Sequence, residues 1–303
     1  MDWLLKLTKP PTPSSLMETD WRAIKWGEEK TMKSKLKGMR VRNPEVPSLR
    51  ILVHGPVGAG KSSFITSIDS IFQERMTSAA IPETLSDRSF TKIFKVHRIR
   101  DGETREFLPF VMCDIMGLEV GDSDGAHPDD LIKVLKGQMK DGHKLNPRSR
   151  CSDTDLISSP TLSDRIHCLV SVVPADRVTL MGEDDFKKMK QIREQASEMG
   201  IPQVTMLTKV DQACPDVGKD ITMIYKSKKI KEKMQDCSYK LGVTVSYIFP
   251  VKNYHEETDL DPNVNVLLLS ALTHILNFAN DHVEDKMPPG PANMRNSSCD
   301  NQH

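Results

Sequence analysis

The sequence predicts an α/β fold in which a mostly parallel sheet is covered by helices on both faces. Short apolar runs of strand length alternate along the chain with longer segments whose apolar residues recur at helical spacing. Several of these runs are apolar throughout, as is typical of strands buried on both faces. In addition, a glycine-rich loop joins the first strand of this region to its first helix, which indicates an anion-binding turn at the edge of such a sheet.

The glycine-rich loop spans residues 55–62 and reads G-x-x-x-x-G-K-S. An aliphatic strand at residues 49–54 precedes it, and a helix with an apolar face follows at residues 63–72. This context favours a phosphate-binding loop over a chance turn, because the glycines let backbone N–H groups surround an anion. Lys61 is expected to reach the β- and γ-phosphates, and Ser62 to ligate Mg²⁺. The nucleotide-binding residues predicted here are Gly55, Val57, Gly58, Ala59, Gly60, Lys61, Ser62 and Ser63.

Composition argues against several classes of protein. The 42 basic and 42 acidic residues balance, so no overall field indicates a nucleic-acid or membrane binder. Cys113 and Cys168 lie within apolar runs, where reduced and buried thiols are expected. No window has the length of apolar sequence that a transmembrane helix needs, and charge interrupts residues 1–7 too soon for a secretory signal. We therefore expect a soluble, cytoplasmic protein.

Punctuation by proline and charge divides the chain into three parts. Residues 1–47 form an extension with a basic helix, residues 48–285 the phosphate-loop domain, and residues 286–303 a disordered tail. The basic segment at residues 21–42 has two interpretations. It is either a solvated helix held against the core by its tryptophans, which we favour because Glu28 and Glu29 interrupt the charge, or a helix that binds a membrane or partner.

The second and third predicted strands lie at residues 91–99 and 107–113. The first of these alternates apolar and polar residues, as a half-exposed edge strand does. Asp101 and Gly102 predict a hairpin between the two. The second is a continuous apolar run that ends at Asp114. A carboxylate at that edge of the sheet, beside the phosphate loop, is placed to hold Mg²⁺.

Asp114 also begins a D-x-x-G motif that ends at Gly117. In a GTPase-like site the Gly117 N–H would contact the γ-phosphate, and the following loop would respond to it. An ordinary aspartate at the end of a strand, followed by a turn, is the alternative. The threonine that would sense Mg²⁺ and the γ-phosphate remains open among Thr77, Thr84 and Thr91.

Residues 118–165 are rich in Asp, Gly, Ser and Pro and contain one predicted helix, at residues 129–137. A segment this long is usually functional, and we expect it to bind a protein partner. A buried strand at 165–173 and a helix at 183–199 follow, and then a strand at 202–207.

The strand at 202–207 leads directly into the motif Thr208-Lys209-Val210-Asp211. At this place the motif selects guanine, because the Asp211 carboxylate would accept hydrogen bonds from two N–H groups of the base that adenine does not present together. Lys209 would lie along the base, and Thr208 would tie this loop to the phosphate loop. A missing partner for a buried polar group makes such discrimination strong. Lys252, after the last strand, is expected to cover the far side of the guanine.

The remaining elements complete the alternating pattern. Residues 217–240 predict a lysine-rich helical segment with a solvated face, for which binding to nucleic acid or anionic lipid is the alternative. Residues 243–251 predict the last strand. Asp261 and Pro262 form a helix-starting pair for a final helix at residues 263–283. Together these elements predict a P-loop nucleoside-triphosphatase domain of the GTPase-like type.

Several of these stretches resemble the interferon-induced protein 44 and 44-like family. The resemblance covers roughly residues 20–285, and the chain looks most like a short, fish-type member without the larger members' amino-terminal domain. It implies a cytoplasmic, interferon-inducible, GTP-binding protein of innate antiviral immunity. The stretches that carry it are residues 51–64, 108–118, 164–168, 207–211 and 267–272.

Binding of GTP or GDP with Mg²⁺ is expected to be firm and hydrolysis slow. Efficient small GTPases usually have a glutamine after the D-x-x-G glycine, which orients the attacking water. Leu118 stands there and cannot do so. No arginine finger is identifiable, since Arg75, Arg88 and Arg98 only lie near the relevant region.

Four functional classes remain open. The chain is a nucleotide-gated interaction protein, a hydrolase activated by self-association into a homo-oligomer, an ATP-dependent kinase, or a scaffold that binds no nucleotide. The guanine motif argues against the kinase, and the intact phosphate-loop and aspartate residues argue against the scaffold.

Overall fold

The computed structural model describes residues 14–78, 93–115, 117–118, 127–145 and 156–288. Within these residues, six strands form one sheet in the order β2-β3-β1-β4-β5-β6. β2 is antiparallel to β3, and every other neighbouring pair is parallel. The predicted mostly parallel sheet with an edge strand after the first helix is thus confirmed. The strands are β1 (Leu49–His54), β2 (Lys95–Arg100), β3 (Phe107–Asp114), β4 (Cys168–Pro174), β5 (Gln203–Thr208) and β6 (Ile248–Pro250).

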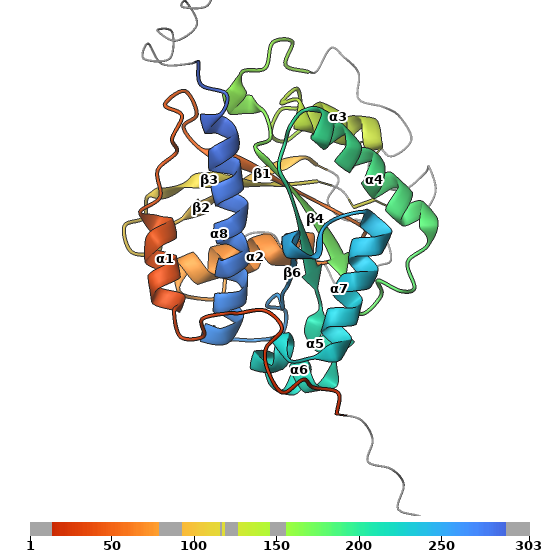
Figure 1. Ribbon diagram of the computed structural model, residues 1–303. Coiled ribbons are helices and arrows are strands. Elements are labelled where there is room, and N and C mark those ends of the chain that lie inside the picture. The colour runs from red at the N-terminus through yellow and green to blue at the C-terminus, as the bar shows by residue number, and fades with distance from the viewer. Residues whose placement is uncertain (1–13, 79–92, 116, 119–126, 146–155, 289–303) are drawn as a thin grey trace, which may run out of the picture.

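Helices cover both faces of the sheet (Figure 1). α1 (Glu29–Lys37), α2 (Lys61–Gln73) and α8 (Pro262–Glu284) lie on one face. α3 (Pro128–Leu135), α4 (Glu183–Glu198) and α7 (Lys228–Leu241) lie on the other. The short elements are α5 (Val210–Ala213), α6 (Pro215–Lys219) and the 3-10 turns η2 (Leu162–Asp164), η3 (Ile221–Tyr225) and η4 (Val245–Tyr247).

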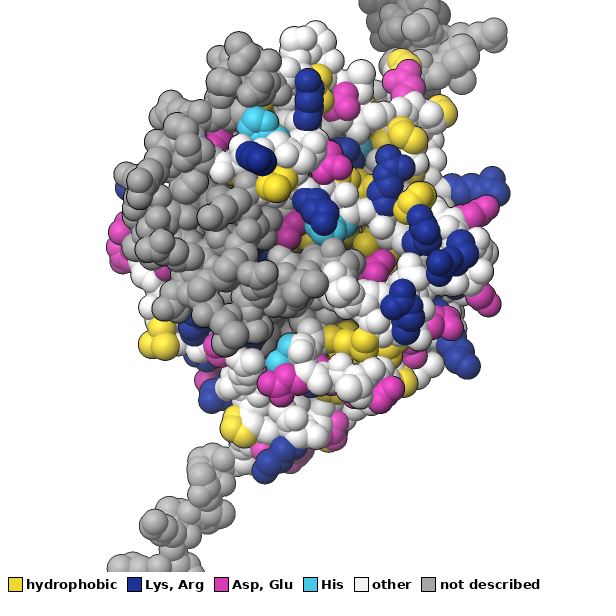
Figure 2. All heavy atoms as spheres, turned by 180° about the vertical axis from the view of Figure 1, so that it is seen from behind, with side chains coloured by type: hydrophobic (Ala, Val, Ile, Leu, Met, Phe, Trp, Pro, Cys, Tyr) yellow, Lys and Arg dark blue, Asp and Glu magenta, His cyan; other side chains and the backbone are white. Residues whose placement is uncertain are grey.

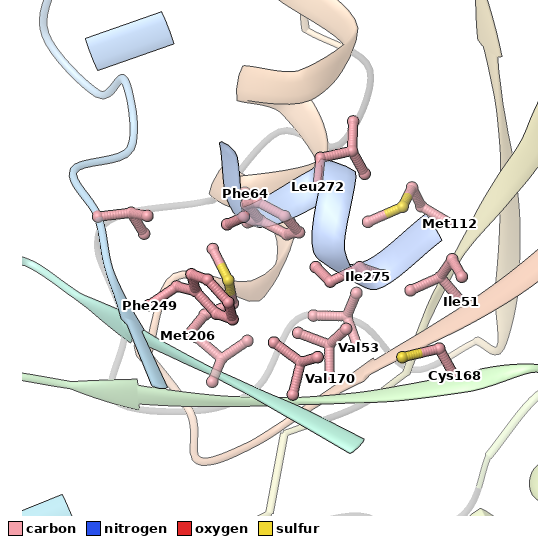
Figure 3. Packing of buried hydrophobic residues seen from close by; sticks show 14 of the residues in the cluster. Ile51, Val53, Phe64, Met112, Cys168, Val170, Met206, Phe249, Leu272 and Ile275 are labelled. Carbon is pink, nitrogen blue, oxygen red and sulfur yellow. The ribbon is translucent and has the colours of Figure 1, made fainter. Parts of the chain in front are cut away.

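The apolar core between the sheet and its first helical layer fixes the phosphate-loop end of the molecule. Figure 3 shows Phe64 of α2 and Leu272 and Ile275 of α8 packed over Val53 and Val170 of the central strands. All five side chains are fully buried. Burial of each such side chain stabilises the fold by roughly 1.5–3 kcal/mol. The loop between β1 and α2 therefore joins two elements that the core holds rigidly.

The thiols in the central strands are buried and free, as predicted. Cys113 and Cys168 lie in β3 and β4 and form no disulfide. Burial raises the pKa of the Cys113 thiol to about 11, so this side chain packs as a small apolar group.

Residues 14–47 lie along the core, as the favoured interpretation of the basic segment predicted (Figure 1). α1 packs on α8. The Trp21 ring meets the Tyr225 ring edge-on, with centroids 5.0 Å apart, and Trp26 is also partly buried against the core.

On the face seen in Figure 2, Lys and Arg side chains lie among Asp and Glu side chains. None of the described helices combines the length and hydropathy needed to cross a bilayer.

The helical segment predicted at residues 217–240 is helical in the structure, with two interruptions. The structure divides this segment into the end of α6, η3 and α7. Ser227 causes the break, because its side chain accepts a hydrogen bond from the Ile230 N–H and so begins α7 at Lys228. Ile224 and Tyr225, just before it, are buried, which holds the preceding turn against the core.

The last strand is shorter than the predicted residues 243–251. Only Ile248–Pro250 pairs with β5, and Val245–Tyr247 form a 3-10 turn. The Arg22 guanidinium donates to the carbonyl oxygens of Ile248 and Val245 at 2.7 and 2.8 Å. A side chain from the N-terminal segment therefore satisfies the outer carbonyls of this edge, where a further strand would otherwise pair.

Candidate nucleotide-binding site

The phosphate loop lies at the carboxyl edge of the parallel strands, where β1 gives way to α2. Gly55 has φ +148, and a Cβ at this position would lie 2.2 Å from the Val172 carbonyl oxygen of β4. Gly60 has φ +96 and immediately precedes α2. Both positions require glycine, so the motif spacing follows from how closely the loop approaches its neighbours. Lys61, Ser62 and Ser63 form the first turn of α2.

Two side chains from neighbouring strand ends hold consecutive carbonyls of this loop. The Thr208 hydroxyl, at the end of β5, donates to the Ala59 carbonyl oxygen at 2.6 Å. The Asn253 amide, after β6, donates to the Gly60 carbonyl oxygen at 3.0 Å. The predicted contact between Thr208 and the phosphate loop is confirmed. We call Thr208 and Asn253 the carbonyl clamp.

Asn253 and Lys252 together follow the last predicted strand, where the loop that covers the guanine is expected, but the contact of Asn253 with the phosphate loop is not predicted from the sequence. The Lys252 ammonium pairs with Glu257 at 2.6 Å. Burial alone would raise the pKa of the Glu257 carboxyl, but hydrogen bonds headed by that from Lys252 lower it to about 2. Lys252 is thus engaged in its own loop. The only sequence signal for Asn253 is an amide donor beside Lys252, at the end of a strand.

Ser62 and Asp114 meet where a divalent cation would sit. The Ser62 hydroxyl donates to Asp114 Oδ2 at 2.8 Å. The Asp114 side chain is buried, and its Oδ1 has no hydrogen-bond partner. Burial raises the pKa of Asp114, against the opposing charge of Lys61 and the bond from Ser62. A buried carboxylate oxygen without a partner suits a hard cation, so these residues fit Mg²⁺.

Other ligands of such a cation would come from the nucleotide and water. Among the residues described, no group of three or more His, Cys, Asp or Glu side chains is placed to hold a metal ion. Mg²⁺ in nucleotide sites is usually held by one or two protein groups together with phosphate oxygens and several waters. The Ser62 and Asp114 pair matches that pattern.

The D-x-x-G segment returns to the phosphate loop and packs against it. A Cβ on Gly117 would lie 2.6 Å from Val57 Cγ2 and 3.0 Å from Lys61 Nζ. Leu118 forms a parallel bridge with the loop, in which its N–H donates to the Gly55 carbonyl and its carbonyl accepts from the Val57 N–H, at 3.0 and 3.3 Å. The Leu118 side chain is buried. The structure therefore brings Gly117 to the loop and directs the following side chain into the core.

Lys61 lies within the loop that it is predicted to serve. Its ammonium donates to the carbonyl oxygens of Gly55 and Pro56 at 3.1 and 2.9 Å. The residue is only 7% exposed. These contacts hold the Lys61 ammonium within the phosphate loop, beside Gly117.

The predicted base-recognition motif lies at the same edge of the sheet. Lys209 has φ +56 and precedes α5, so Asp211 lies in the first turn of a short helix. Burial lowers the pKa of Lys209, and the nearby Asp176 carboxylate opposes this effect. The left-handed Lys209 turns the chain sharply between β5 and α5, which carries Asp211 past the end of the strand.

Of the three threonines that could sense the γ-phosphate, the structure describes only Thr77. Thr84 and Thr91 lie outside the described residues. Thr77 bonds to Ser70 near the far end of α2, with 3.1 Å between the two hydroxyl oxygens. Ser70 lies nine residues along α2 from Lys61, and at about 1.5 Å per residue this puts Thr77 about 14 Å from the phosphate loop. Thr77 is therefore not beside this site.

Comparison with known proteins identifies close sequence relatives. The chain is 36% identical to interferon-induced protein 44 of Homo sapiens over 271 residues, which cover 88% of this chain and 60% of that protein. It is 34% identical over 242 residues to the 44-like protein of Homo sapiens, covering 79% of this chain and 53% of that protein. The chain thus spans somewhat more than half the length of these relatives. No protein-family model matches the chain.

Solved structures with a similar fold are GTP-binding proteins. One is Toc33 from Arabidopsis thaliana in complex with GDP and Mg²⁺. The match covers 86% of this chain and 94% of the Toc33 chain, with a TM-score of 0.48 and 14% identity. Another is a probable GTP-binding protein, engB, for which the match covers 77% of this chain and 99% of the engB chain, with a TM-score of 0.43 and 11% identity. The phosphate loop before α2 and the mostly parallel six-stranded sheet described above are themselves the features of a P-loop GTPase-like fold.

Proposed function

Because the chain belongs to the family of interferon-induced protein 44 and its 44-like relatives over the region that it shares with them, we propose that it binds guanine nucleotides with Mg²⁺. The observation that carries this proposal is the orphaned Oδ1 of Asp114. It lies on a buried carboxylate beside the first turn of α2, where Ser62 already contacts the other oxygen. The phosphate loop, with its buried ammonium, supplies the matching site for a phosphate chain.

In this proposal each predicted residue has a distinct role. Backbone N–H groups of residues 58 and 60–63 and the Lys61 ammonium hold the phosphates, while the Val57 and Ala59 N–H groups stay bonded to the carbonyls of Leu118 and Pro56. Ser62 and Asp114 hold Mg²⁺. Thr208 and Asn253 keep the loop in shape through its carbonyls. Asp211 reads the guanine base, Lys209 lies along it, and Lys252 closes its far side.

Hydrolysis by this site would be slow. The place of the water-orienting glutamine is taken by Leu118, whose side chain is buried and whose backbone is bound to the phosphate loop. An aliphatic group there supplies neither a donor nor an acceptor to the attacking water. The nucleotide state would then act chiefly as a signal, which the segment at residues 118–165 passes to a protein partner in the cytoplasm.

The biological setting proposed is the interferon-induced antiviral response, of which the name of the relatives supports the interferon-induced part. Exposure of cells to interferon should raise the amount of this protein, measured against an unrelated cytoplasmic protein in the same lysate. An unchanged amount would contradict the setting without touching nucleotide binding. The second candidate is a hydrolase activated by self-association, for which turnover per molecule would rise with protein concentration.

Nucleotide titration tests the central proposal. The wild type and the variants Lys61→Ala and Asp211→Ala would be titrated with GDP, GTP and ATP in the presence of Mg²⁺. We expect the wild type to prefer guanine nucleotides, Lys61→Ala to lose measurable affinity for all of them, and Asp211→Ala to lose the preference for guanine. A well-folded wild type that binds neither GDP nor GTP would refute the proposal.

A further inference from the structure

The loop that follows β4 brings an arginine to the phosphate loop. Arg177 Nη2 lies 3.5 Å from the Gly58 carbonyl oxygen. A Cβ on Gly58 would lie 3.1 Å from the same nitrogen, so the guanidinium rests directly over this glycine. The loop is anchored close by, where the Ala175 N–H donates to the Thr208 carbonyl at 2.8 Å. Arg177 therefore lies at the mouth of the proposed nucleotide site.

The Arg177 guanidinium is held only weakly in this structure. Apart from the Gly58 carbonyl, its polar neighbour within the described part of the chain is Asp176, with 3.8 Å between Arg177 Nε and Asp176 Oδ2. Both distances are longer than those of strong charge-assisted hydrogen bonds. The side chain is also 49% exposed. The guanidinium could bind a phosphate group with little loss of existing interactions, because it has few contacts to break first.

Asp176 links this arginine to the base-recognition motif. Its Oδ1 is buried and has no hydrogen-bond partner. Its charge also acts on Lys209, where it opposes the effect of burial on the pKa. One carboxylate thus interacts with two cations, Arg177 over the phosphate loop and Lys209 after the end of β5. Such a carboxylate can hold both cations in place without neutralising either fully.

From this geometry we infer that Arg177 is a further nucleotide-contacting residue, whose guanidinium binds the diphosphate part of the guanine nucleotide, with Asp176 as its positioning residue. The inference rests on the proposed nucleotide site. Arginine suits this task because its planar fork can donate two parallel hydrogen bonds to phosphate oxygens. The absence of a side chain at Gly58 leaves the guanidinium room to approach.

Arg177 belongs to none of the sequence motifs that predict the nucleotide site. The arginines named from the sequence lie elsewhere or outside the described residues. Arg75 follows the far end of α2, Arg98 lies on the edge strand β2, and Arg88 is outside the described residues. Arg177 is brought there because β4 runs beside β1 and ends at the same edge.

The affinities of GMP, GDP and GTP test the inference, each measured with Mg²⁺ by competition for one fluorescent guanine nucleotide. We expect Arg177→Ala to weaken GDP and GTP binding by about tenfold, as for the loss of one partly exposed charge-assisted hydrogen bond. GMP, which lacks the β-phosphate, should change by less than about twofold. Arg177→Lys should recover part of the loss because it restores the charge. Arg165→Ala, an exposed arginine just before the amino end of β4, is the matched control and should leave all three affinities unchanged.

Each outcome bears on the inference. Equal GDP affinity in Arg177→Ala and the wild type would overturn it, as would an equal loss for GMP or a similar loss in Arg165→Ala. Thermal unfolding without nucleotide should give the same midpoint for Arg177→Ala and the wild type, because the arginine makes only weak contacts there. Failure of the wild type to bind any guanine nucleotide would refute the proposed function itself and this assignment with it.

Discussion

Replacement of Thr208 by valine tests how the phosphate loop is held. The change removes one hydroxyl and keeps the shape of the side chain nearly constant. The hydroxyl has a single proton, and the distances of 2.6 Å to the Ala59 carbonyl and 3.3 Å to the Val173 carbonyl show that it is given to Ala59. Thr208 is fully buried, so water cannot replace the lost donor. We expect the free energy of unfolding to fall by about 1–3 kcal/mol, the range for leaving a buried acceptor unpaired.

Urea unfolding of the wild type, Thr208→Val and Thr208→Ser measures this effect. Serine keeps the donor but removes a buried methyl group, which costs about 1 kcal/mol. Hydrogen exchange of the amides at residues 59–62 separates the two variants, because only valine should release the loop and speed exchange there. An unchanged unfolding free energy for Thr208→Val, together with unchanged exchange in the loop, would show that the bond to Ala59 does not hold the loop.

Three further outcomes follow from the site and the core. Gly55→Ala should give little folded protein, because its Cβ would lie 2.2 Å from the Val172 carbonyl and the backbone of neither strand can yield; a soluble, cooperatively unfolding variant would contradict this. Leu118→Gln should lower the unfolding free energy by about 1–3 kcal/mol and leave GTP turnover slow, because the side chain at this position is buried and an amide there must be desolvated; fast single-turnover hydrolysis would show that the side chain can reach the nucleotide. Burial lowers the pKa of His167 to about 4, so this group stays neutral in the fold while its unfolded form takes up a proton below about pH 6.5. Stability should therefore fall as the pH drops from about 6.5 to about 4, by up to about 1.4 kcal/mol per unit for this histidine. Other buried histidines with lowered pKa values, such as His54, add to the slope, so unfolding free energies across that range should show a smaller slope for His167→Gln than for the wild type, and an equal slope would contradict this.

The structure explains why His167 should resist protonation. Its Nδ1 accepts the Arg50 N–H at 2.9 Å, and its Nε2 lies 2.9 Å from the Leu162 carbonyl, to which it donates. A proton on Nδ1 would break the first bond and place a charge in a buried site. The expected slope therefore has a structural cause that His167→Gln removes.

The main elements of the fold could be predicted from the sequence because their signals are local. The aliphatic run of β1, the glycine spacing of the phosphate loop and the apolar face of α2 lie within about 25 consecutive residues. The start of α8 is also a local signal. Pro262 is its first residue, and the Asp261 side chain just before it caps the helix by accepting a hydrogen bond from the Asn263 N–H. The motifs at Asp114 and Thr208 could be placed too, because each directly follows a buried strand.

The structure differs from the sequence prediction where long-range contacts overrule local preference. The helical segment at residues 217–240 is interrupted before Lys228, where Tyr225 is buried against Trp21 from the N-terminal segment. The last strand begins late, at Ile248, and Arg22, more than two hundred residues away, binds the carbonyls of Val245 and Ile248 there. No pattern within either segment records those partners.

By itself the sequence determined the phosphate loop, the aspartate that ends β3 and the threonine that ends β5, because each is fixed by its own strand. Only the tertiary structure decided that Asn253 completes the carbonyl clamp and that Arg177 lies over Gly58. The physical reason is the order of the sheet. Parallel strands that are distant in the chain end at one edge, and side chains there become neighbours without any spacing in the sequence that relates them.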